Sequence, residues 1–187
     1  MRMRALTALV ATATLLALTP GGALAGNPKG AVQDARMLRA LVSENPSAAR
    51  FDEVKALVAQ MQASQAALAR GRAKLPKAVR TALVAMSQSF EGLRAWKPQS
   101  TFGRQLRIYA LWLTATEHNA LGRASVALRG VEAKPVAAQL KALGTALKGF
   151  VKDIDTMNAA KDGQLGAAGR GVPADELSAV SAFSSSG

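Results

Sequence analysis

The sequence predicts an all-α fold, an elongated up-and-down helical bundle of four long helices plus a shorter N-terminal helix. After residue 25, 33 of 162 residues are alanine, which has the highest helix propensity. Isoleucine, which favours strands, occurs only twice in that part, as Ile108 and Ile154. Apolar residues recur in steps of three and four, and prolines fall between these periodic segments, where helices would begin.

The first 25 residues have the pattern of a secretory signal peptide. Two arginines precede an uncharged stretch over residues 5–18, and Ala23-Leu24-Ala25 matches an A-x-A cleavage site. The mature chain would then begin at Gly26. The alternative is an uncleaved membrane anchor, but the stretch is shorter than the about 20 residues that span a bilayer. We therefore expect a periplasmic or secreted protein.

The first two predicted helices are separated by an Asn-Pro pair. The first covers residues 28–43 and has an apolar stripe that faces one side. Asn45 is a suitable N-cap and Pro46 a suitable first residue for the second helix, which runs to about Lys74. The apolar residues in register on the second helix are Val54, Val58, Met61 and Leu68.

The third and fifth predicted helices, residues 76–96 and 135–162, have an unusually regular apolar seam. Steps of four and three alternate, which is the a/d spacing of coiled coils and of helices packed at a shallow angle. Because the connections are short, neighbouring helices are expected to be antiparallel. The seam residues are Val79, Leu83, Met86, Phe90 and Leu93 in the third helix and Val136, Leu140, Leu143, Leu147, Phe150, Ile154 and Met157 in the fifth.

The fourth predicted helix, residues 101–129, is apolar on nearly every side over residues 106–113. A helix of this kind is usually central and buried. The alternative is a short strand, because arginines bound the run and it contains Ile, Tyr and Trp. No other segment resembles a partner strand, so we expect a buried helix.

The apolar periodicity ends after residue 162. Four glycines within residues 163–171 and a final Ser-Ser-Ser-Gly predict a disordered, flexible tail over residues 163–187. One or two amphipathic turns between Pro173 and Phe183 are the alternative. The predicted parts are therefore a signal peptide (1–25), a helical bundle domain (26–162) and the tail.

The composition excludes several classes of function. The chain has no cysteine, so it forms no disulfide scaffold, thiol nucleophile or thiolate metal site. Lys and Arg number 24 against 12 Asp and Glu, but this excess is spread along the chain, without the concentrated run typical of nucleic-acid binding. No glycine-rich phosphate loop or nucleophile elbow is present. We expect neither enzyme activity nor a specific nucleic-acid ligand.

Two groups of basic residues are candidates for an anionic partner. The denser group surrounds the connection at 97–100 and includes an aromatic side chain, a combination that suits a phosphate-bearing surface or a lipid interface. The alternative is that its tryptophan only covers the end of the bundle. The predicted partner-binding residues are Arg94, Trp96, Lys97, Arg104 and Arg107. The second group, near the turn between the second and third helices, is Arg70, Arg72, Lys74, Lys77 and Arg80.

His118, the only histidine, indicates a different function. A histidine and a methionine from facing helices of a bundle can hold haem. His118 could thus be a metal or haem ligand, with Met37, Met61 or Met86 as the second ligand. The alternative is a half-buried, hydrogen-bonded histidine, with the methionines as core residues.

We therefore predict an exported, non-enzymatic helical-bundle binding protein that engages anionic envelope components or client polypeptides. Net positive charge supports such association, and peripheral membrane contact is compatible with it. This prediction requires no cofactor. The first alternative is a b-type haem or metal-binding bundle that uses His118. The second is a structural bundle that self-associates as a homo-oligomer.

Overall fold

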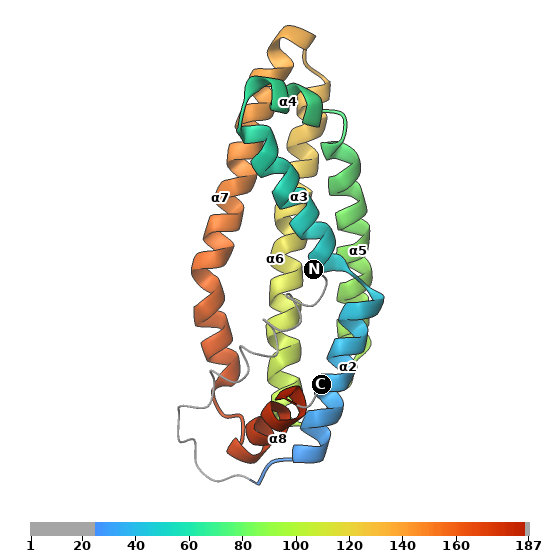
Figure 1. The fold of residues 1–187 in the computed structure, drawn as a ribbon, viewed down its shortest axis with the longest axis vertical. Coiled ribbons are helices and arrows are strands. Elements are labelled where there is room, and N and C mark those ends of the chain that lie inside the picture. The colour runs from blue at the N-terminus through green and yellow to red at the C-terminus, as the bar shows by residue number, and fades with distance from the viewer. Residues whose placement is uncertain (1–24, 186–187) are drawn as a thin grey trace. The chain divides into compact units, whose positions relative to one another are not determined.

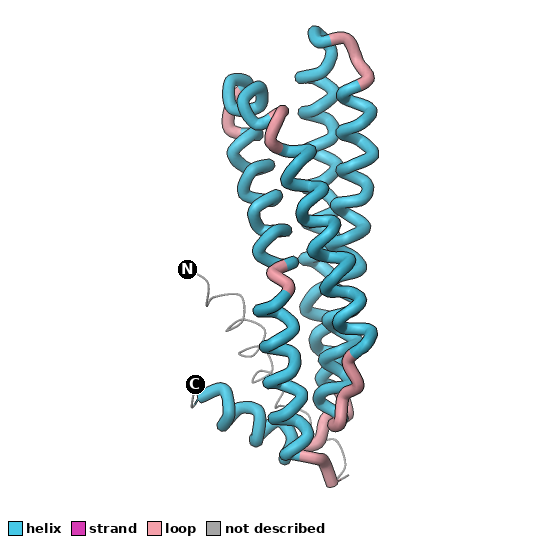
Figure 2. The backbone as a smooth tube through the Cα atoms, turned by 90° about the vertical axis from the view of Figure 1, so that its right-hand side faces the viewer, coloured by secondary structure: helices cyan, strands magenta, loops and turns pink. Residues whose placement is uncertain are grey.

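The computed structural model describes residues 25–185, so the predicted signal peptide lies outside the described residues except for Ala25. The described part is all-helical, without strands, and confirms the predicted helical bundle (Figure 2). None of its helices combines the length and the apolar character needed to cross a membrane. The helices are α2 (Pro28–Glu44), α3 (Ser47–Gln62), α4 (Gln65–Gly71), α5 (Leu75–Ala95), α6 (Thr101–Glu132), α7 (Val136–Gly169) and α8 (Ala174–Ser185) (Figure 1).

The helices form two compact units, which we describe separately. Of the described residues, the first unit contains 25–45, 90–113 and 161–185, and the second contains 46–89 and 114–160. One limit between the units falls between α2 and α3, and the others fall inside α5, α6 and α7. The predicted domain limit at residue 162 stays a prediction.

In the second unit, the second predicted helix is divided into α3 and α4. The backbone of Ser64 is extended (φ −164°, ψ 161°), and its hydroxyl oxygen accepts a hydrogen bond of 3.1 Å from the Ala67 N–H. This bond caps α4. A Cβ at Gly71 would overlap the Met61 side chain, so glycine permits the close approach of α4 to α3. The sequence around Ser64 is rich in Ala and Gln, which are good helix formers and conceal the break.

The predicted seams form the core of the second unit. Val79 and Met86 of α5 are buried, as are Leu143 and Phe150 of α7. The Phe150 ring meets the Phe51 ring of α3 edge to face, with centroids 6.1 Å apart, an arrangement that aromatic pairs favour. The seam of α7 is not buried along its full predicted length, because Val136 in its first turn is 73% exposed.

In the first unit, residues 163–169 and 174–185 are helical, whereas the sequence predicts a flexible tail. The helix α7 continues to Gly169, and α8 packs against α2 beside the first turns of α6 (Figure 1). Val180 of α8 lies in a core cluster with Ala31, Ala35 and Phe102. The composition of this segment predicts disorder when it is considered alone, whereas contact with α2 gives α8 a buried side.

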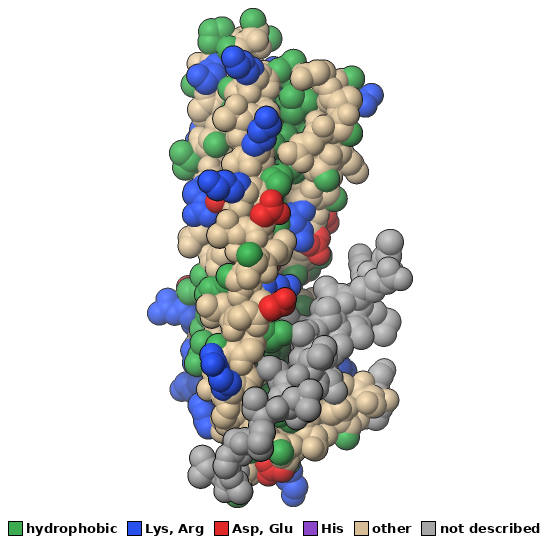
Figure 3. All heavy atoms as spheres, turned by 90° about the vertical axis from the view of Figure 1, so that its left-hand side faces the viewer, with side chains coloured by type: hydrophobic (Ala, Val, Ile, Leu, Met, Phe, Trp, Pro, Cys, Tyr) green, Lys and Arg blue, Asp and Glu red, His purple; other side chains and the backbone are tan. Residues whose placement is uncertain are grey.

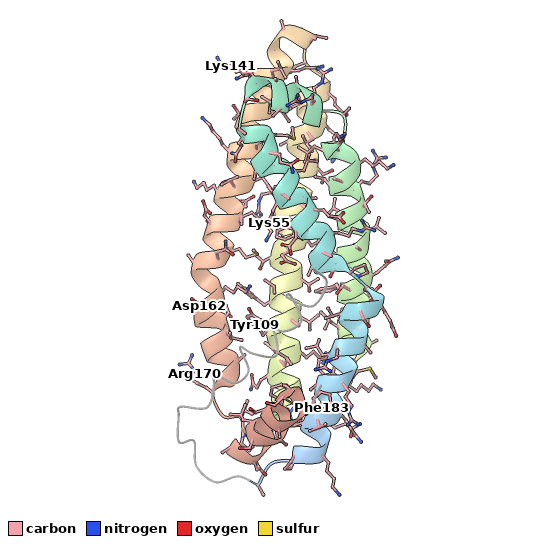
Figure 4. All side chains as sticks on the ribbon, in the orientation of Figure 1. Lys55, Tyr109, Lys141, Asp162, Arg170 and Phe183 are labelled. Carbon is pink, nitrogen blue, oxygen red and sulfur yellow. The ribbon has the colours of Figure 1, made fainter. Side chains whose placement is uncertain are left out.

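Cation–π contacts add to the packing of α8. The Phe183 ring lies 5.1 Å from the Arg36 guanidinium carbon and 4.9 Å from that of Arg39 (Figure 4). Such contacts stabilise a surface position by about 0.5–1 kcal/mol.

The apolar run of α6 is less enclosed than predicted: Tyr109 and Ala110 are buried, but Ile108 is 61% exposed.

Asp34 of α2 is a buried carboxylate at the N-terminus of α6. It accepts hydrogen bonds from the Gln99 N–H at 3.0 Å, the Ser100 N–H at 2.9 Å and the Ser100 hydroxyl at 2.6 Å. The Ser100 hydroxyl oxygen in turn accepts from the Gly103 N–H at 2.8 Å. A helix leaves its first N–H groups without intrahelical partners and carries partial positive charge there, so a carboxylate is favourable.

Glu176 of α8 is a second buried carboxylate at the same helix end. Its oxygens accept hydrogen bonds from the Phe102 N–H at 2.7 Å, the Thr101 N–H at 3.3 Å and the Asn27 N–H at 2.8 Å. Glu176 is 1% exposed. One side chain thus connects α8, the start of α6 and the segment before α2.

We predict that Gly103→Ala destabilises the protein by about 1–3 kcal/mol, the usual range for overpacking. A Cβ at residue 103 would overlap the Asp34 carboxylate and lie 2.8 Å from the Asp34 Cβ. The free energy of unfolding in urea measures the effect. Gly122→Ala in the same helix is the control, because its Cβ meets nothing within 4 Å. That control should stabilise by up to about 1 kcal/mol, and equal effects of the two variants would contradict the explanation.

We also predict that Glu176→Ala destabilises the first unit by about 2–3 kcal/mol, because the variant leaves buried N–H groups without an acceptor. Hydrogen exchange should accelerate at the Thr101 and Phe102 amides and along α8. Asp162→Ala, at an exposed position of α7, is the control and should leave these rates unchanged. Unchanged protection of the two amides in Glu176→Ala would refute the capping role.

Candidate anion-binding site

A hollow of about 420 Å³ opens in the second unit, where the start of α5 meets the end of α6 and the start of α7. Three cationic side chains line it, Arg72 from the C-cap of α4 and Lys77 and Arg80 from the first turns of α5. Apolar side chains, the amide of Gln139 and the carboxylate of Glu132 complete the wall. We call it the cationic hollow, and its lining residues are Arg72, Ala73, Pro76, Lys77, Arg80, Leu128, Val131, Glu132, Gln139 and Leu143.

The local sequence fixes these cations on one side of the helix start. Leu75 is 2% exposed and anchors the first turn of α5 in the core. Lys77 and Arg80 are three residues apart, so they are neighbours on the helix surface. The Arg72 Nη1 donates to the Gln139 Oε1 of α7, and the Gln139 Nε2 donates to the Lys134 carbonyl at 3.0 Å. The guanidinium of Arg72 is thereby held at the hollow.

In the part of the chain that the structure describes, the three cations of the hollow form no ion pair with Glu132, the carboxylate in its lining. Among the described residues, no ion pair is formed by Arg72, Lys77 or Arg80, whereas Arg123 in the same unit pairs with Asp153 at 2.8 Å. The first turn of α5 also contains no acidic residue. Because a helix start carries partial positive charge, it adds to the positive potential of the three cations.

Two further depressions adjoin the cationic hollow. One, of about 290 Å³, shares Arg80 and Glu132 with it and adds Arg129. The other is a more open groove of about 630 Å³ between the end of α6 and the start of α7, and it shares Val131. We call it the apolar groove, and its lining residues are Ala127, Gly130, Val131, Lys134, Ala138, Lys141, Ala142, Thr145 and Ala146 (Lys141 is labelled in Figure 4). A cationic hollow beside an apolar groove suits a ligand with an anionic head and an apolar chain.

The structure uses two of the five predicted partner-binding residues for the packing of the first unit. Trp96 is 6% exposed and lies in a core cluster with Leu38 and Leu93. Arg107 donates from Nε to the Leu93 carbonyl and from Nη2 to the Arg94 carbonyl, each at 2.7 Å. These carbonyls belong to the last turn of α5, where a cation is favourable.

The other three predicted residues, Arg94, Lys97 and Arg104, are exposed. Arg94 lies over the Phe90 ring at 5.9 Å, and the Arg104 Nη2 donates to the Thr101 hydroxyl at 2.9 Å. On the face that Figure 3 shows, Lys and Arg side chains are dispersed among apolar and uncharged groups rather than gathered. Partner binding through these five residues stays a prediction.

His118 is half-buried on α6 in the second unit. Its Nε2 lies 3.5 Å from the Ser87 hydroxyl oxygen, and that hydroxyl also donates to the Leu83 carbonyl at 3.1 Å. The described residues contain no group of three or more His, Asp or Glu side chains that could hold a metal ion. Of the proposed second ligands, Met61 and Met86 are buried in the core. Haem or metal binding through His118 stays a prediction.

The basic residues around the α4–α5 turn form a group in the sequence, but the predicted partner-binding residues lie around the other connection, at 97–100. The signal that could have selected the group at the α4–α5 turn is the absence of acidic residues from Arg70 to Arg80, across the start of a helix. The apolar lining could not be found this way, because it comes from α6 and α7. No protein-family model, curated protein or solved structure matches this chain.

Proposed function

We propose that the protein is an exported, non-enzymatic binding protein that engages an anionic amphiphile of the cell envelope through the cationic hollow. The observation that carries this proposal is that Arg72, Lys77 and Arg80 line one hollow without a carboxylate partner among the described residues. The expected export rests on the signal-peptide pattern of residues 1–25.

The chemistry of the lining favours a head group that carries phosphate. Arg72 offers a planar guanidinium that suits bidentate contact with phosphate oxygens, and Lys77 adds a point charge. Leu128, Val131 and Leu143 supply an apolar floor beneath these charges.

The apolar groove supports the same ligand class. It adjoins the cationic hollow at Val131, and alanine forms much of its lining, so an acyl chain could lie between the end of α6 and the start of α7. Each buried CH₂ contributes about 0.8 kcal/mol to such association. Lys134 and Lys141, the charged residues of this groove, have the sign that favours an anionic ligand.

We predict that the triple variant Arg72→Gln, Lys77→Gln and Arg80→Gln binds vesicles of phosphatidylglycerol in phosphatidylcholine about 100-fold more weakly than the wild type. The estimate follows from about 1 kcal/mol for each basic residue near an anionic surface. Co-sedimentation at several salt concentrations measures the dissociation constant, whose dependence on salt should also become weaker.

The matched control is the triple variant Arg94→Gln, Lys97→Gln and Arg104→Gln, which removes the same charge from exposed positions of the first unit. It should bind within about threefold of the wild type. If both variants lose affinity equally, binding follows net charge alone, and the cationic hollow is not the site.

We further predict that Ala142→Glu in the apolar groove weakens vesicle binding at least tenfold, because a carboxylate there would repel the head group and oppose burial of an acyl chain. Ala142 is only partly exposed, and glutamate is a good helix former, so α7 should persist. Far-UV circular dichroism and vesicle binding are the two measurements. Inorganic phosphate should bind to the cationic hollow equally well in the wild type and in Ala142→Glu. Unchanged vesicle binding by the folded variant would remove the groove from the site.

A further inference from the structure

The backbone N–H of Gly26 lies on a carboxylate of α8. It donates to the Asp175 Oδ2 at 3.2 Å, while the Asp175 Oδ1 accepts from the Glu176 N–H at 3.0 Å. The next residue, Asn27, donates its N–H to Glu176. Asp175 is therefore held from two sides, with one oxygen directed to its own helix start and the other to Gly26.

The surroundings of Gly26 admit no side chain. A Cβ at this position would lie 2.5 Å from the Asp175 Oδ1, 2.7 Å from the Glu176 Cγ and 2.8 Å from the Pro173 Cβ. All three atoms come from α8 or the residue before it. Glycine is the one residue type that can approach α8 so closely, because it has no Cβ.

The predicted cleavage site lies directly before this glycine. Hydrolysis of the Ala25–Gly26 peptide bond by a signal peptidase would consume one water, leave a carboxylate on Ala25 and convert the Gly26 amide nitrogen into an amine. Near neutral pH this amine carries a proton, since the ordinary pKa of a terminal amino group is about 8. A neutral N–H donor would become an ammonium group at the same place.

We infer that Asp175 is the receptor for the amino terminus that signal-peptide removal creates. In the processed chain an ion pair between Gly26 and Asp175 would join the start of the chain to α8. In the precursor the same atoms form only a neutral-donor hydrogen bond. Processing would therefore strengthen the attachment of α8 to α2, which Glu176 and Val180 already provide.

Two carboxylates lie against Gly26, as this inference requires. The carboxylates against it are those of Asp175 and Glu176, both on α8. Asp34 on α2 adds a third at the neighbouring connection, where the Asn27 Nδ2 donates to the Gln99 carbonyl at 3.1 Å. Opposite charges nearby raise the pKa of an amine. The ion pair would thus stabilise the fold fully below the unfolded-state pKa and lose this effect as the pH rises through the folded-state value.

The test uses the exported chain, labelled with ¹³C-glycine and purified from the periplasm or the medium. N-terminal sequencing should give Gly26 as the first residue, and a different start would overturn the inference. The Gly26 ¹³Cα shift, followed by NMR against pH, reports the pKa of its own amino group. This pKa should be higher by about half a unit to one unit in the wild type than in Asp175→Asn.

Asp162→Asn removes an equal charge from an exposed position of α7 and should leave the Gly26 pKa at the wild-type value. Equal pKa values in the wild type and in folded Asp175→Asn would overturn the inference. If Asp175→Asn does not fold, the wild type unfolded in urea replaces it as the reference. A folded wild type whose Gly26 pKa equals that reference would then be the negative result.

Discussion

The first unit depends on the burial of two carboxylates at the start of α6. Asp34 and Glu176 come from α2 and α8, which are far from this helix start in the sequence. Removing a carboxylate from water costs several kcal/mol unless hydrogen bonds and nearby positive charge compensate. The free N–H groups of α6 supply both, so the helix start and the carboxylates stabilise one another. Among the described residues, no buried side-chain nitrogen or oxygen atom lacks a partner.

This constraint explains where sequence analysis succeeded and where it did not. Periodicity predicts which residues of a helix form an apolar stripe and become buried. The seam residues Met86 and Phe150 are accordingly buried. Periodicity does not predict a carboxylate whose partners are distant backbone groups, because Glu176 resembles any solvated acid in a polar segment. When the contacts of Glu176 with the backbone are not known, the glycines after residue 162 predict a disordered segment. The break at Ser64 was missed for a related reason, since its cap and the contact of Gly71 with Met61 are tertiary features.

The two groups of basic residues show that the sequence alone does not predict which of them forms a binding site. In sequence both are clusters of Lys and Arg near a helix connection. Arg107 lies beside the end of a helix, where free carbonyls accept its N–H groups, and it therefore serves the fold. Lys77 and Arg80 lie at the start of a helix, where the backbone offers donors and no acceptors. The sequence shows where the charged residues occur. Whether their side chains hydrogen-bond to the backbone depends on which end of the neighbouring helix lies beside them.

That difference is also the physical reason why we propose an anionic ligand for the cationic hollow. Lys77 and Arg80 lie near the positive end of α5, and Arg72 adds a third positive charge, while Glu132 offers one negative charge in return. Positive charges at a helix start repel the positive end of the helix dipole and one another. Each reduces stability by a few tenths to about 1 kcal/mol. A bound phosphate would turn this repulsion into attraction, so part of the binding free energy would come from relief within the protein. Ligand binding should therefore raise the stability of the second unit, because a ligand that binds only the folded state stabilises it.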